Sequence, residues 1–70
     1  MKKTAKKTQR KPRAKLIGAD SNIFNLMSIA SRALKDAGHR DDATEMSNRV
    51  MSSSSFDEAL AIICEYVDAY

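Results

Sequence analysis

The chain has 70 residues, a formal net charge of +3 and a single cysteine, Cys64. A chain of this length makes at most one small domain with a marginal core, and one cysteine excludes an internal disulfide. No run approaches the roughly 18 apolar residues of a membrane-spanning helix, so the sequence predicts a cytoplasmic protein without membrane contact.

Residues 1–15 form a basic arm with eight Lys and Arg residues and no acid, whereas residues 16–70 hold four bases and nine acids. The arm has no hydrophobic periodicity, so burial cannot offset the entropy of ordering it, and we predict that it is disordered. It is not a secretory signal, because lysines continue where an apolar core should begin. Leu16 and Ile17 begin the domain as a short extended lead-in.

A first helix is predicted over about residues 21–37. Asp20 or Ser21 can accept hydrogen bonds from its first amides, and Gly38 can end it in a left-handed conformation. Apolar side chains at helical spacing define one face. They are Ile23, Leu26, Met27, Ala30, Ala33, Leu34 and Ala37.

Two further helices are predicted over about residues 41–51 and 56–68. The second has a narrow apolar face made of Ala43, Met46 and Val50. The third begins at a capping box, in which Ser55 accepts from a helix amide and Glu58 reaches back. Its wide apolar arc predicts that it touches both other helices or a second chain. The arc consists of Phe56, Ala59, Leu60, Ile62, Ile63, Cys64, Tyr66, Val67 and Tyr70.

These patterns predict an all-α fold, in which a small three-helix bundle over residues 16–70 follows a disordered basic N-terminal arm over residues 1–15. The sequence shows no strand pattern and no internal repeat.

Side chains suited to catalysis are few. His39 is the sole histidine and falls in the first loop, while Cys64 falls on the inner edge of the third helix. We interpret them as a solvated imidazole and a small buried thiol. Asp41 and Asp42 beside His39 offer too few ligands for an oxygen-rich metal site. The sequence therefore predicts a non-enzymatic protein with no catalytic residue, no metal site and no cofactor.

Two functions remain open. The first is an accessory protein that acts through protein–protein interaction of its helical body, with a protein partner or as a homodimer. It depends on large apolar side chains that exceed what three short helices can bury. They are Phe24, Ile29, Ile62 and Tyr70. The alternative is that the lead-in and the helix ends cover these side chains.

The second function is non-specific nucleic-acid binding through the arm, whose bases can neutralise phosphates and release counterions. They are Lys2, Lys3, Lys6, Lys7, Arg10, Lys11, Arg13 and Lys15. The arm has no aromatic residue for base stacking, so sequence-specific recognition of single strands is not expected. The third helix carries four acids and no base, which excludes it as a DNA-reading helix. The alternative is a solvated leader or a tether to an acidic partner.

Several segments carry a resemblance to known proteins. They are IGAD (residues 17–20), NIFNL (22–26), IASR (29–32), FDEALAII (56–63) and EYV (65–67). Together they resemble small uncharacterised proteins of gut Firmicutes that are often associated with phage or other mobile elements. The resemblance covers about residues 16–68 and leaves out the basic arm. It implies a bacterial cytoplasmic setting and a mobile-element origin, and it transfers no activity and no functional residue.

Overall fold

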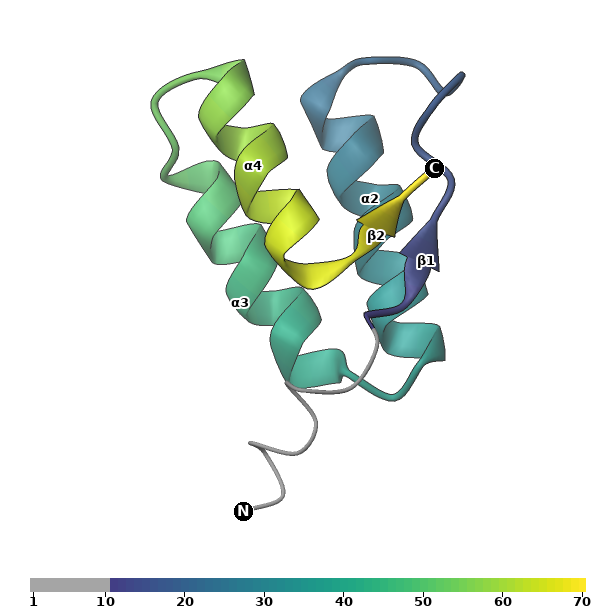
Figure 1. Ribbon diagram of the computed structural model, residues 1–70. Coiled ribbons are helices and arrows are strands. Elements are labelled where there is room, and N and C mark those ends of the chain that lie inside the picture. Colours follow the sequence, from purple (N-terminus) through teal and green to yellow (C-terminus); the bar gives the residue numbers. More distant parts are fainter. Residues whose placement is uncertain (1–10) are drawn as a thin grey trace.

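The computed structural model describes residues 11–70. Three helices dominate these residues: α2 (Ile23–Asp36), α3 (Arg40–Met51) and α4 (Phe56–Tyr66). Two short strands, β1 (Arg13–Ala14) and β2 (Asp68–Ala69), precede and follow them in the chain (Figure 1). The predicted three-helix bundle is confirmed. The expectation of disorder for residues 1–10 lies outside the described residues.

Each helix packs against the other two, so α4 touches both of its neighbours as the width of its apolar arc predicted. The core between them is entirely apolar. Its largest fully buried side chains are Leu34, Met46, Ile63 and Val67. No helix within residues 11–70 is long and apolar enough to cross a membrane.

The residue that caps the start of α2 differs from the prediction, whereas the end of the helix agrees with it. Asn22, rather than Asp20 or Ser21, caps the helix, and its side-chain oxygen accepts from the amide of Phe24 at 2.8 Å. Asp20 instead fixes the preceding turn, because its carboxylate accepts from the amide of Asn22 at 3.3 Å. At the other end, Gly38 has φ +86°, which confirms the left-handed conformation that glycine adopts without steric cost.

The capping box of α4 is confirmed. Ser55 Oγ accepts from the amide of Glu58 at 3.1 Å, and the Glu58 carboxylate accepts from the amide of Ser54 at 3.0 Å. The reciprocal bond thus reaches one residue further back than in the usual motif. The helix ends at Tyr66 rather than at residue 68, because Val67 is extended, with φ −134° and ψ 157°, and turns its side chain into the core.

The two strands form a parallel pair that the sequence did not predict. Arg13 lies opposite Asp68 and Ala14 opposite Ala69. Beyond these pairs, the amide of Tyr70 donates to the Ala14 carbonyl at 3.0 Å. Figure 1 shows β1 and β2 side by side; β1 also contacts α2 and β2 contacts α4, so both ends of the described chain meet beside the helices.

The pairing corrects the predicted arm, whose disorder was expected to extend to residue 15. Residues 11–15 instead belong to the domain, because Ala14 and Leu16 are buried against the helices. The segment alternates with the period of a strand: Pro12, Ala14 and Leu16 lie at least partly buried, and the bases between them stay exposed. The exposed bases are Lys11, Arg13 and Lys15.

Candidate nucleic-acid interface

Basic side chains from β1 and α2 surround one shallow hollow on the surface. Arg13 of β1, Lys15 directly after β1 and Arg32 of α2 all line it. The hollow has a volume of about 410 Å³, and Asp36 is the one acid that lines it. The remaining lining residues are apolar, so three cationic side chains surround a small apolar surface.

A second hollow, of about 450 Å³, lies between α2 and α3. Arg32, Lys35 and Asp36 line it together with three serine hydroxyl groups. Arg32 and Asp36 belong to both hollows, which places them side by side along α2. We call the four bases of this surface the basic face: Arg13, Lys15, Arg32 and Lys35.

The basic face has four cations, and the one acid that lines its hollows, Asp36, forms no ion pair with them. All four side chains are exposed, and none forms an ion pair with another group of residues 11–70. Arg13 makes one contact of another kind, since its guanidinium lies 4.3 Å from the centre of the Tyr70 ring. A group of unpaired cations around a hollow is suited to binding an anion with several charges.

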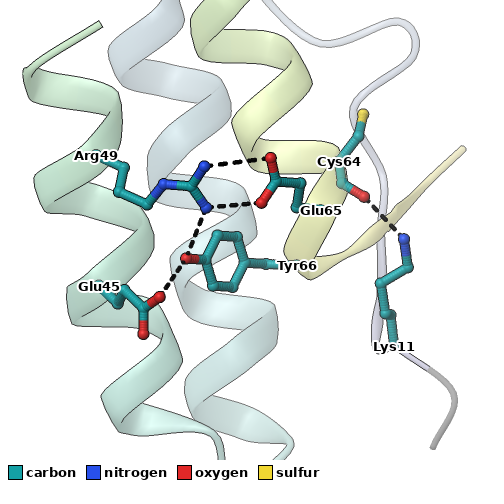
Figure 2. Close-up of polar contacts among 6 residues, drawn as sticks. All are labelled: Lys11, Glu45, Arg49, Cys64, Glu65 and Tyr66. Carbon is teal, nitrogen blue, oxygen red and sulfur yellow. Dashed lines mark hydrogen bonds and ion pairs between the residues drawn. The ribbon is translucent and has the colours of Figure 1, made fainter. Parts of the chain in front are cut away.

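The opposite side, formed by α3 and α4, uses its charges in a different way. Arg49 of α3 donates to both carboxylate oxygens of Glu65 on α4, at 2.6 and 3.2 Å, and to the Tyr66 hydroxyl at 3.1 Å. Tyr66 in turn donates to the Glu45 carboxylate at 2.9 Å. Figure 2 shows this chain of contacts, which joins the two helices across their surface.

The contacts shift the pKa values of the groups that they join. The hydrogen bonds from Arg49 hold the pKa of the Glu65 carboxyl below its ordinary value, because they stabilise the charged form. Partial burial of its ring raises the pKa of the Tyr66 hydroxyl. Further acids on the two helices make this side anionic. They are Asp41, Asp42, Asp57 and Glu58.

Lys11 holds the start of β1 against the end of α4. Its ammonium donates to the Cys64 carbonyl at 2.8 Å and lies 3.8 Å from the Asp68 carboxylate. Figure 2 shows Lys11 crossing to Cys64 from the neighbouring segment. Of the eight basic residues predicted to contact nucleic acid, Lys11 therefore has a carboxylate partner, while Arg13 and Lys15 form no ion pair within residues 11–70.

The remaining predicted contact residues lie outside the described part of the chain. They are Lys2, Lys3, Lys6, Lys7 and Arg10. Arg32 and Lys35 were not predicted, because the predicted cationic site was confined to the arm. Their signal was present in the sequence: two bases three residues apart on the polar side of a predicted helix share one face.

The predicted protein interface does not form one surface. Ile62 is 7% exposed and belongs to the core, so the domain itself covers it, as the alternative interpretation had it; Ile29 is half-buried against the core. Phe24 and Tyr70 are exposed, at 56% and 45%. Phe24 instead joins an apolar hollow of about 330 Å³ at one end of the bundle.

The two candidate reactive side chains also differ from expectation. Cys64 is exposed, so the prediction of a buried thiol is wrong; the inward positions of α4 are taken by Ala59, Ile62 and Ile63. His39 is half-buried rather than solvated, and its Nδ1 lies 3.4 Å from the Asp42 carboxylate. Within residues 11–70 no group of three or more His, Cys, Asp or Glu side chains could hold a metal ion.

No family model, no curated protein and no solved structure matches this chain. The resemblance to mobile-element proteins therefore stays a prediction, and the function is argued from the geometry described above.

Proposed function

We propose that the protein binds nucleic acid non-specifically, through phosphate contacts on the basic face. The observation that carries this proposal is the convergence of four exposed basic side chains, from residues 13–15 and α2, around two adjoining hollows, with no ion pair to any of them within residues 11–70. The bases of residues 1–10 add to the same cationic end of the chain, since β1 follows them directly in sequence.

The groups of the basic face are suited to phosphate chemistry. Arg13 and Arg32 carry planar guanidinium groups, which can donate two parallel hydrogen bonds to one phosphate. Lys15 and Lys35 add point charges, and the serine hydroxyls between α2 and α3 are further donors to phosphate oxygens. None of these contacts reads a base edge, so the expected binding is independent of sequence.

The distribution of charge also sets the orientation of the bound polyanion. The acids of α3 and α4 repel phosphates, whereas the basic face attracts them, so a nucleic acid is expected to approach β1 and α2. Because Ala14 anchors β1 against the helices, Arg13 and Lys15 are held beside α2 before binding. Less ordering is then needed when the complex forms.

The test compares two arginines in titrations of a fluorescent oligonucleotide at several salt concentrations. Arg32→Gln removes one charge from the basic face, and Arg40→Gln removes the same charge from the start of α3. Arg40 is also exposed, and it forms no ion pair within residues 11–70. The slope of log Kobs against log salt is negative. Arg32→Gln should reduce its magnitude by about 0.7 to 0.9, the value for one phosphate contact. Arg40→Gln should leave the slope unchanged.

Two outcomes contradict the proposal. Equal losses in the two variants would mean that binding depends on net charge alone rather than on the basic face. An absence of binding by the full chain at low salt would exclude nucleic acid as its ligand.

A second candidate function is association through the apolar end of the bundle. Phe24, Met51 and Phe56 are all exposed there around the 330 Å³ hollow, which no charged residue lines. A second copy of the chain could cover these side chains. The homodimer predicts a mass that rises with concentration in sedimentation and falls in Phe56→Ser, with oligonucleotide affinity unchanged. A strict monomer at all concentrations excludes the homodimer.

A further inference from the structure

The fold brings an aromatic ring to the basic strand, from a position far away in the sequence. The Leu16 amide donates to the Tyr70 main-chain oxygen at 2.8 Å, and the Tyr70 amide donates to Ala14. These bonds place Tyr70 beside the end of β1, where the Arg13 guanidinium lies 4.3 Å from the ring centre. The basic segment therefore gains the aromatic group that its own sequence lacks.

The register places these groups on one face of the small sheet. Burial alternates through β1 and the residues on either side of it, so Lys11, Arg13 and Lys15 are exposed on one side at strand intervals of about 6.6 Å, and the residues between them face the domain. Asp68 is paired with Arg13 and shares its face, and Tyr70, just after β2, has its ring beneath the Arg13 guanidinium. Asp68 is the acid of the set, and Lys11 lies 3.8 Å from its carboxylate.

The stacked pair of Arg13 and Tyr70 remains accessible. Tyr70 is 45% exposed although a guanidinium covers part of its ring. Both planar groups can stack on a nucleobase, because every base has a π face and the guanidinium also stacks on aromatic surfaces. Arg13 of this pair also lines a hollow together with Lys15, just after β1, and Arg32 of α2.

We propose that this face of β1 and β2 is a binding site for single-stranded nucleic acid. One nucleobase of the strand stacks on the Arg13–Tyr70 pair, and Lys15 and Arg32 bind the phosphates next to that nucleobase. The inference rests on the proposed function and adds the class of nucleic acid that the site prefers.

A single strand fits this site better than a duplex. The bases of a duplex are paired and stacked on each other, so an aromatic side chain at the surface cannot reach their faces without opening the helix. An unpaired strand offers its bases directly. A duplex could use only the charges of the basic face, whereas a single strand uses both the charges and the ring.

The experiment measures the affinity of the full chain for three labelled probes: a short single strand of DNA, its RNA counterpart and a DNA duplex of the same length. Wild-type protein should bind the single strands more tightly at equal salt. Tyr70→Leu should weaken single-strand binding about tenfold, the loss typical of one stacked base, and leave duplex binding unchanged. Tyr70→Phe should retain the wild-type affinity, because the ring is kept.

Phe56→Leu is a matched control, because Phe56 is also 45% exposed but lies at the apolar end of the bundle. It should alter neither affinity. A direct readout comes from Tyr70→Trp, since the chain contains no other tryptophan. Its fluorescence should be quenched by the single strands and not by the duplex. Comparing the affinities for the DNA strand and the RNA strand shows which of the two the site prefers.

The outcomes separate the two proposals. If duplex and single strands bind equally, and Tyr70→Leu and Phe56→Leu behave alike, the stacking site is wrong and the phosphate-binding function stands. Unchanged tryptophan fluorescence at saturation with single strand contradicts the stacking site as well. If no probe binds at low salt, both proposals fail together.

Discussion

The two sides of the molecule use similar charged side chains for different purposes. On the α3–α4 side, Arg49 donates both ends of its guanidinium to Glu65 and links two helices. On the β1–α2 side, Arg32 lies exposed at the junction of two hollows and has no carboxylate partner within residues 11–70. The modest net charge of +3 therefore conceals an anionic side with a structural ion pair and a cationic side that is open.

The comparison shows what decides the role of a charge in a small domain. A bidentate pair fixes two side chains and neutralises them, so Arg49 contributes to helix packing and little to the external field. Basic side chains without an ion-pair partner contribute little to folding but create a local positive potential. The difference between the sides predicts that mutations will separate stability from binding.

The largest expected effect concerns the anchor of the basic face. Ala14→Asp places a carboxylate at a position that is 3% exposed and should destabilise the attachment of β1 by about 3 kcal/mol. Lys15→Asp introduces the same side chain one residue later, on the exposed side, and should change stability by less than about 0.5 kcal/mol. Urea unfolding of the two variants measures the difference. Equal stability would show that β1 is not part of the folded domain.

A smaller effect concerns the ion pair on the opposite side. The folded state lowers the pKa of Glu65, so the folded chain keeps the carboxylate charged at a pH where the unfolded chain begins to protonate it. The resulting stability is present above the ordinary value of 4.5 and is lost as the pH falls through the folded pKa. Both side chains are exposed, so solvent screening keeps the contribution small.

Arg49→Gln should therefore flatten the loss of thermal stability below pH 4.5, because Glu65 then has a nearly ordinary pKa in both states. Arg40→Gln is the control and should lose thermal stability below pH 4.5 as the wild-type protein does. Melting temperatures measured across this pH range test the prediction. If Arg49→Gln lost stability at low pH as steeply as the wild-type protein, Glu65 would be excluded as the cause of that loss.

The helices and most of the core could be predicted from the sequence because their signals are local. Leu26, Ala30 and Leu34 recur with the helical period, and all three are buried as expected. The same reasoning placed Met46 and Val50 in the core. Helix periodicity failed in α4, because its apolar arc was too wide to fix the rotation of the helix: Ile62 turns inward and Cys64 outward.

The strand pair could not be predicted because its partners are far apart in the chain. Residues 11–16 alternate between bases and less polar residues, but the charge density concealed this period, and a strand this short is stable only when paired. Its partner is residues 68–69, which the sequence analysis assigned to the third helix and its end. The stacked contact of Arg13 and Tyr70 depends on that pairing and was hidden with it.

The most direct test of the account maps the binding surface by NMR. A single-stranded oligonucleotide is added to the full chain labelled with ¹⁵N, and the amide signals are followed. The account predicts shifts at Arg13, Lys15, Arg32 and Tyr70, with signals such as that of Glu58 on α4 unaffected. Shifts centred on α3 and α4, or confined to residues 1–10, would contradict the claim that β1 and α2 carry the nucleic-acid interface.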